Sequence, residues 1–206
     1  YFFAHSIRFL KKKGRLVFLT ASSWLDAGYG RALREFLLHN FKVIAVIESA
    51  AESFFADASI NTCITVLERE ADPHARENQL TRFVLFNREL SHVLGAPGSV
   101  AERDPVNLLA DLILRSDVGS STEAFRVRQV SQSGLSRVTD WTNLSAVTQG
   151  WGKYLRAHEV FFKIIERGAS KLRSLSTIAD VRFGVKTGAN EFFYLKGEEN
   201  DRTRNG

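Results

Sequence analysis

The sequence contains one cysteine, no methionine and only three prolines among 206 residues. A single cysteine cannot form an internal disulfide, which excludes a disulfide-stapled secreted scaffold and favours a cytoplasmic protein. No uncharged apolar run approaches the roughly 18 to 20 residues that a membrane-spanning helix needs. The first residues also lack an initiator methionine and the basic start of a signal peptide. We therefore expect a fragment of a longer gene product.

Charge is nearly balanced overall, with 28 Lys and Arg against 23 Asp and Glu, but it is unevenly distributed. Residues 1–119 hold 14 residues of each sign, whereas residues 120–190 hold 11 basic and 5 acidic residues. A basic segment joined to a neutral one indicates a polyanionic partner, because Lys and Arg gain by displacing counterions from phosphates. A solvated basic surface has the same composition, so charge alone does not decide.

Alternating helix and strand patterns in the first fifty residues predict an α/β fold. Residues 1–12 repeat apolar side chains at helical spacing, and residues 16–19 form a short apolar run typical of a strand buried on both faces. The same two patterns recur in residues 31–40 and 43–47. Helices and strands in alternation, with short connections, indicate a doubly wound sheet.

The pattern changes after Ala50. Residues 60–67 and 82–86 are predicted strands with only a polar loop between them, so we expect them to pair as antiparallel neighbours. The sheet should then be parallel at first and end in an antiparallel edge. Residues 105–115 have the spacing of a helix, and residues 119–122 (Gly-Ser-Ser-Thr) are the best candidate for a linker.

The C-terminal part has weaker patterns. Residues 125–130 alternate apolar and basic side chains, as a half-exposed strand does, and residues 150–156 are aromatic and basic on a predicted turn. Residues 160–165 have helical spacing. Residues 181–195 are predicted to form two short strands around a turn at residues 186–190.

The sequence contains no complete catalytic or metal-binding motif. Its five histidines are scattered without a partner cysteine, which argues against a metal site. Cys63 lies in a predicted strand, where a small buried side chain is expected rather than a nucleophile. Residues 28–30 (Gly-Tyr-Gly) lack the third glycine of a nucleotide-binding loop and indicate a flexible helix start. Glu48 with Glu52 or Asp57 could bind a metal in a nuclease, but no Asp…Glu-x-Lys pattern surrounds them, so solvated charge is favoured.

Two adjacent phenylalanines, Phe54 and Phe55, lie in a loop just after a predicted buried strand. Both rings cannot easily point into one core. One interpretation is that a ring plugs the end of the sheet, and the other is that it forms a stacking wall for a planar ligand. Taken alone, the residues favour the plug.

Five short phrases stand out by their order and spacing: residues 14–19 (GRLVFL), 23–25 (SWL), 32–37 (ALREFL), 52–55 (ESFF) and the strand 62–67. Together they resemble the second half of a gamma-class adenine-N6 DNA methyltransferase from a restriction–modification system. The type is that of the Taq and Eco57I enzymes, in the type II and IIG branch. A second segment, residues 174–193, resembles the start of that family's target recognition domain.

The resemblance implies the C-terminal half of a Rossmann-like methyltransferase sheet, mostly parallel with antiparallel edge strands, followed by a partial α+β DNA-recognition region. It implies methyl transfer from S-adenosylmethionine to N6 of an adenine that is flipped out of the duplex, because the amino group cannot be reached within the stack. In the family an aromatic ring stacks on the flipped base. Phe55 occupies the matching position, and Phe54 is the fallback.

The sequence departs from the family in lacking two motifs. The acidic-aromatic-glycine motif that binds S-adenosylmethionine and the catalytic Asn-Pro-Pro-Tyr loop are both absent, and no Pro-Pro pair occurs at all. We expect both motifs upstream of Tyr1, so we assign no catalytic residue and expect the isolated chain to be inactive. The predicted division is a catalytic half in residues 1–118, a linker or elaboration in residues 119–170 and the start of the recognition domain in residues 171–206.

The predicted partners are double-stranded DNA and the remainder of the parent restriction–modification polypeptide. Candidate DNA contacts, mostly to phosphates, are Arg182, Lys186, Thr187 and Asn190, with Lys153 and Arg156 in second rank. Two alternatives stay open. The chain could be a non-catalytic DNA-binding or specificity module of a restriction system, and the parent could carry a nuclease domain in addition.

Overall fold

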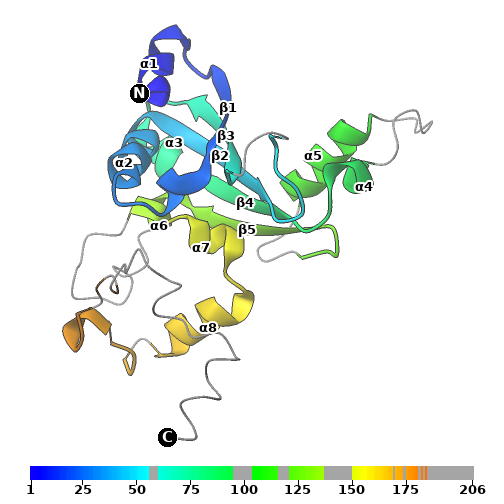
Figure 1. Ribbon diagram of the computed structural model, residues 1–206. Coiled ribbons are helices and arrows are strands. Elements are labelled where there is room, and N and C mark those ends of the chain that lie inside the picture. Colours follow the sequence, from blue (N-terminus) through cyan, green and yellow to red (C-terminus); the bar gives the residue numbers. More distant parts are fainter. Residues whose placement is uncertain are drawn as a thin grey trace, which may run out of the picture. The chain divides into compact units, whose positions relative to one another are not determined.

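The computed structural model describes residues 1–55, 60–94, 104–115, 121–136, 150–168, 170–173, 175–180, 182 and 184. Contacts divide the chain into two units, Tyr1–Leu172 and Arg173–Gly206. The first unit contains a five-stranded mixed sheet with helices packed against it (Figure 1), so the predicted α/β class is confirmed. The second unit contains the 3-10 helix η4 (Leu175–Thr177). The predicted division by function at residues 118 and 170 stays a prediction.

The sheet is built from β1 (Arg15–Ala21), β2 (Phe41–Ser49), β3 (Thr62–Arg69), β4 (Leu80–Phe86) and β5 (Phe125–Ser131). The helices of the first unit are α1 (Phe2–Ser6), α2 (Gly30–Asn40), α3 (Pro73–Glu77), α4 (Leu90–Leu94), α5 (Pro105–Arg115), α6 (Gln132–Ser136), α7 (Gly152–Arg156) and α8 (Glu159–Gly168), with 3-10 turns η1 (Ile7–Phe9) and η2 (Ser22–Leu25). The elements predicted up to residue 168 are present, except that the turn expected at 150–156 is the short helix α7. The predicted strands within residues 181–195 lie outside the described residues. No helix in the described ranges is long and apolar enough to cross a membrane.

The strand order corrects the expected pairing. The order is β1-β3-β2-β4-β5, and β3 runs antiparallel to both of its neighbours, β1 and β2. β4 pairs with β2 in parallel and with β5 in antiparallel fashion. The prediction that β3 and β4 pair with each other is therefore wrong, because β2 lies between them. The connection from β3 to β4 contains α3 and passes across β2. The only parallel ladder among the described strands is β2–β4, and one antiparallel strand lies inside the sheet rather than at its edge.

β1 is also less buried than its apolar run predicts. Its residues alternate between exposed and half-buried, and Val17 is 60% exposed. Among the described strands β1 has one neighbour, β3, so it is an edge strand. Leu16 and Phe18 pack on the core on one face, while Val17 and Leu19 point away from it. β2 lies in the centre of the sheet between β3 and β4, and each of its residues is buried or half-buried.

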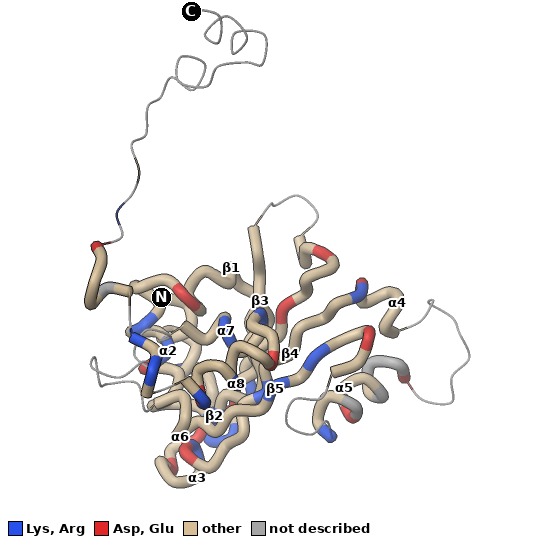
Figure 2. Tube along the Cα trace, turned by 90° about the horizontal axis from the view of Figure 1, so that it is seen from below, with Lys and Arg blue, Asp and Glu red and all other residues tan. Residues whose placement is uncertain are grey.

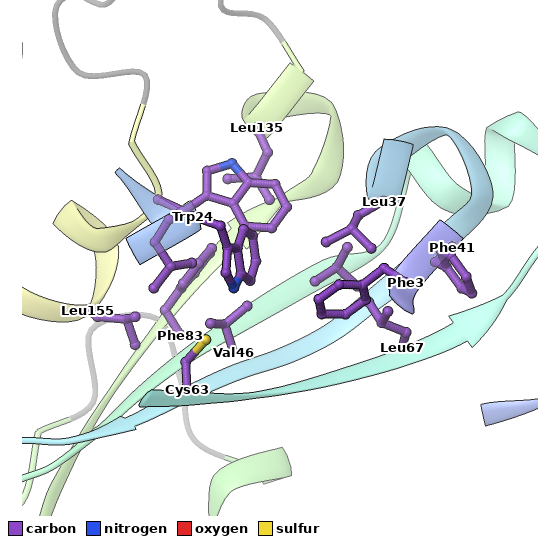
Figure 3. Packing of buried hydrophobic residues seen from close by; sticks show 13 residues of the cluster. Phe3, Trp24, Leu37, Phe41, Val46, Cys63, Leu67, Phe83, Leu135 and Leu155 are labelled. Atoms are coloured by element: carbon purple, nitrogen blue, oxygen red, sulfur yellow. The ribbon is translucent and has the colours of Figure 1, made fainter. Parts of the chain in front are cut away.

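The main core lies between the sheet and the helical layer that contains α2, α6 and α7 (Figure 3). Trp24 and Trp151 meet edge to face there, with ring centroids 5.7 Å apart, although they are distant in sequence. A smaller cluster on β4 and β5 packs against α4 and α5. Its buried members are Val84, Phe86, Phe125 and Val127.

Gln132 fastens the start of α6 to β2 from within the core. Its side chain is 2% exposed, and its amide nitrogen donates to the carbonyl oxygens of Leu38 and Phe41 at 3.1 and 2.8 Å. Its amide oxygen accepts the N–H of Val43 at 3.0 Å. Buried amides are tolerated when they are paired in this way. The segment after β5 therefore belongs structurally to the sheet.

Candidate functional site

A pocket of about 580 Å³ opens at one end of the strands of the sheet. β2 and β4 run parallel, so their C-terminal ends meet there, and the antiparallel β3 begins there. In open α/β sheets, ligands bind at the carboxyl ends of the parallel strands. The lining residues are Glu48, Ser49, Ala50, Ala51, Glu52, Ser53, Ile60, Asn61, Thr62, Leu85 and Arg156.

The loop that follows β2 forms one wall of the pocket and is held by side chains bonded to backbone. Ser49 Oγ accepts the N–H groups of Ala51 and Glu52 at 3.2 and 3.1 Å. A carboxylate oxygen of Glu52 accepts the N–H of Leu90 at 2.7 Å, which joins the loop to the first residue of α4. Such local bonds replace the strand ladder where β2 ends. The described residues 50–55 are therefore held by hydrogen bonds, and none of them belongs to the two hydrophobic clusters.

Phe54 and Phe55 follow directly from this wall. Ser53 Oγ donates to the carbonyl oxygen of Phe55 at 2.9 Å and accepts its N–H at 3.3 Å, which closes a tight turn. Phe55 is 45% exposed and Phe54 is half-buried, and neither belongs to the two hydrophobic clusters. Neither ring is among the residues that line the pocket, although their neighbour Ser53 is. An exposed aromatic ring such as that of Phe55 is suited to stacking on a planar ligand. The stacking role of either ring stays a prediction.

Arg156 also lines the pocket and is held by two carboxylates. Its Nε and Nη2 lie 3.0 and 2.7 Å from the two oxygens of Glu48, and its Nη1 lies 2.6 Å from Oδ2 of Asp26. Glu48 is 5% exposed, so this bidentate pair neutralises a buried charge. The hydrogen bond with Glu48 raises the pKa of Arg156 above its ordinary value.

The position of Glu48 corrects the interpretation of this residue as solvated charge. It is the next-to-last residue of β2, at a buried position of the strand. A buried glutamate needs a partner of opposite charge. The position of Glu48 at the end of an apolar strand could therefore have indicated in the sequence that it is paired. The partner itself lies 108 positions away, and local spacing gave no indication of it.

Residues 150–156 dock on the turn η2. The N–H of Trp151 donates to the carbonyl of Leu25 at 2.8 Å, and the N–H of Gly152 donates to Oδ1 of Asp26 at 3.1 Å. Trp151 is 3% exposed and Leu155 is fully buried. The aromatic character of this segment therefore serves packing.

Lys153, a predicted DNA contact, lies within this docked segment. Its Nζ lies 4.8 Å from the centre of the Tyr154 ring. Burial lowers the pKa of Lys153 to about 8, and Asp26 opposes part of that effect. A DNA contact by Lys153 stays a prediction.

Other basic side chains of residues 120–190 also have protein partners. Arg126 donates to the carbonyl of Leu155, and Arg128 pairs with Glu159 while its guanidinium lies 3.6 Å from the centre of the Phe162 ring. Basic and acidic positions are interspersed along the trace of the first unit (Figure 2). The basic excess of this segment is thus partly used to hold the fold.

The other predicted DNA contacts are Arg182, Lys186, Thr187 and Asn190. Lys186, Thr187 and Asn190 lie outside the described residues. Arg182 belongs to the second unit, where its Nη2 lies 2.6 Å from a carboxylate oxygen of Asp180. Cys63 is fully buried in β3, as predicted, and burial raises the pKa of its thiol. Within the described ranges no three His, Cys, Asp or Glu side chains are grouped to hold a metal ion.

Comparison with known proteins finds a family match over part of the chain and a shared fold. Residues 1–55 match the family model of the Eco57I restriction-modification methylase. The type IIG restriction endonuclease BpuSI is 17% identical with a TM-score of 0.52, over 98% of this chain and 22% of that chain. A type I restriction-modification methyltransferase subunit from Streptococcus thermophilus is 19% identical with a TM-score of 0.43, over 64% of this chain and 26% of that chain. No curated protein matches the chain.

The chain thus spans about a quarter of the length of these two solved structures. The likeness to BpuSI covers nearly the whole chain and shows that the fold is shared. The predicted resemblance to a restriction–modification methylase of the Eco57I type is confirmed for residues 1–55, and the adenine-N6 class stays a prediction.

Proposed function

We propose that the chain forms part of a DNA methyltransferase that moves a methyl group from S-adenosylmethionine to N6 of a flipped-out adenine, and that the pocket receives this base. The observation that carries the proposal is the pocket at the C-terminal ends of β2 and β4, bordered by the loop that presents Phe54 and Phe55. Its volume lies within the range of about 300 to 1,000 Å³ that is usual for small-molecule sites. Phe55, which is the more exposed ring, stacks on the base.

The charges of the pocket favour binding of an uncharged ring over binding of a phosphate. Among the described residues its lining carries two carboxylates, Glu48 and Glu52, and one guanidinium, that of Arg156. Glu48 and Asp26 already engage this guanidinium. A phosphate would meet net repulsion there. A flipped base is uncharged and planar, so it meets no such barrier.

The chain supplies the pocket and not the transfer chemistry. The family's S-adenosylmethionine and Asn-Pro-Pro-Tyr motifs do not occur in the sequence, and we assign no described residue to the cofactor. Arg182, Lys186, Thr187 and Asn190 remain proposed phosphate contacts. In the complete protein encoded by this gene, absence of an Asn-Pro-Pro-Tyr or Asn-Pro-Pro-Phe motif would overturn the enzymatic proposal and favour a specificity module.

Base flipping provides the direct test. Methylome sequencing of cells that carry the complete gene would identify the modified adenine, and a duplex with 2-aminopurine at that position would report flipping as increased fluorescence. Phe55→Ala should make base flipping less favourable by roughly 1–3 kcal/mol, the usual free energy of one base–aromatic stack, and so reduce the fluorescence increase. Phe55→Trp should retain the increase. Phe9→Ala is the matched control, because that ring is 78% exposed on η1. An unchanged response in Phe55→Ala would withdraw the assignment.

A further inference from the structure

Arg156 joins two parts of the molecule that are far apart in sequence. One arm of its guanidinium holds Glu48 at the end of β2, and the other holds Asp26 at the end of η2. Asp26 in turn accepts the N–H of Gly152 through its second oxygen. The same side chain therefore contacts the pocket wall and fixes the segment that carries it.

The two arms differ in their relation to the pocket. Glu48 and Arg156 line it, whereas Asp26 does not. Glu48 immediately precedes Ser49, whose hydroxyl orders the loop that leads to Phe55. A shift of Glu48 would therefore move the end of β2 on which the loop is built. Asp26 can influence that loop through Arg156, because Arg156 bonds to both carboxylates.

We propose that Arg156 is a positioning residue that couples docking of residues 150–156 to the geometry of the base pocket. The proposal rests on the proposed function for the identity of the ligand, and it replaces a DNA contact as the role of this side chain. Arg suits this role because its planar fork can serve Glu48 bidentately and still reach Asp26. A lysine offers a single ammonium and cannot reproduce this geometry.

The coupling can be tested through Asp26, which lies outside the pocket. Asp26→Asn weakens the ion pair with Arg156 and removes no lining group. Hydrogen–deuterium exchange of the complete protein should then show about fivefold faster exchange in peptides covering residues 150–156 and in those covering residues 49–55. Glu48→Gln should give the same pair of changes from the other arm. Arg156→Lys should fall between the wild type and Arg156→Gln.

Arg128→Gln is the matched control. Arg128 holds the helix α8 through Glu159 and the Phe162 ring, but it does not line the pocket. Its loss should speed exchange in α8 and leave residues 49–55 unchanged. The coupling is refuted if Asp26→Asn affects residues 150–156 alone, or if Arg128→Gln loosens the loop to the same extent.

The 2-aminopurine duplex separates this proposal from the proposed function. If the wild type flips the base, Asp26→Asn should reduce the fluorescence response about threefold or more, and a full response would overturn the positioning role. If the wild type gives no response with its own target duplex, the proposed function fails. The exchange experiment needs no DNA, so it still decides whether Arg156 couples the two segments.

Discussion

The loop 49–55 and the segment 150–156 both border the pocket and both combine aromatic with polar residues, yet they are held in opposite ways. In the segment Trp151 and Leu155 are buried and Arg156 is paired with carboxylates. In the loop Phe55 is 45% exposed, and order comes from serine hydroxyls bonded to backbone. Aromatic composition therefore does not separate a packed segment from an exposed loop. The partner side chains, which are distant in sequence, make the difference.

The largest expected effect tests this contrast by truncating one ring in each region. Trp151 contacts the rings of Trp24 and Phe83 with centroids 5.7 and 6.0 Å apart, so Trp151→Ala should lower the free energy of unfolding by about 3–5 kcal/mol. Phe55→Ala, at an exposed position, should change it by less than about 0.5 kcal/mol. Urea unfolding followed by circular dichroism measures both. Equal losses would mean that Phe55 is a packing residue after all.

The elements could be predicted from the sequence more reliably than their arrangement. The apolar runs at 16–19, 43–47 and 82–86 are strands because short apolar stretches between polar turns fit a sheet. Their order could not be predicted in the same way, since proximity in sequence favours a β3–β4 hairpin. Whether β3 inserts beside β1 instead depends on packing across the whole sheet. The same limit made β1 look like a central strand.

The site was only partly predictable for a related reason. Phe54 and Phe55 were visible as an unusual pair, and the resemblance gave them a role. The Arg156–Glu48 pair joins residues 108 positions apart, and neither has a local pattern that indicates the other. Lys153 and Arg156 were predicted as DNA contacts from residue type alone, and residue type carries no information on the burial and pairing found at residues 150–156.

The tight contact of Gly152 with Asp26 permits a second test of how residues 150–156 are held against η2. A Cβ added to Gly152 would lie 2.2 Å from Oδ2 of Asp26, whereas one added to Gly28 would meet no atom within 4 Å. Because Asp26 is fixed by Arg156, Gly152→Ala should cost about 1–3 kcal/mol of unfolding free energy. Gly28→Ala should be nearly neutral. Thermal unfolding of the two variants compares them, and a neutral Gly152→Ala would show that Asp26 can move aside freely.

Lys153 should make the stability of the folded chain depend on pH at alkaline values. Its pKa of about 8 in the folded protein lies below the ordinary value of 10.5, so between these values the unfolded chain binds more protons. Stability of the wild type should therefore rise with pH in this window. Lys153→Met should be more stable than the wild type at pH 7, by about 1–2 kcal/mol after solvent screening, and this advantage should shrink by pH 10. Unfolding curves from pH 7 to 10 measure it; a constant difference would place the ammonium in solvent.

The smallest expected effect concerns the loop, where hydrogen bonds and not burial maintain the conformation. Ser53→Ala removes both bonds between the Ser53 hydroxyl and the backbone of Phe55. Because Ser53 is exposed, water replaces much of what is lost, and base flipping should weaken by only about 0.5–1 kcal/mol. Ser23→Ala, which removes an exposed bond to Tyr29 outside the pocket lining, should leave flipping unchanged. Fluorescence of the 2-aminopurine duplex measures both. A loss as large as that of Phe55→Ala would mean that the ring stacks only when Ser53 holds it. The conformation of the loop would then matter for flipping as much as the ring itself.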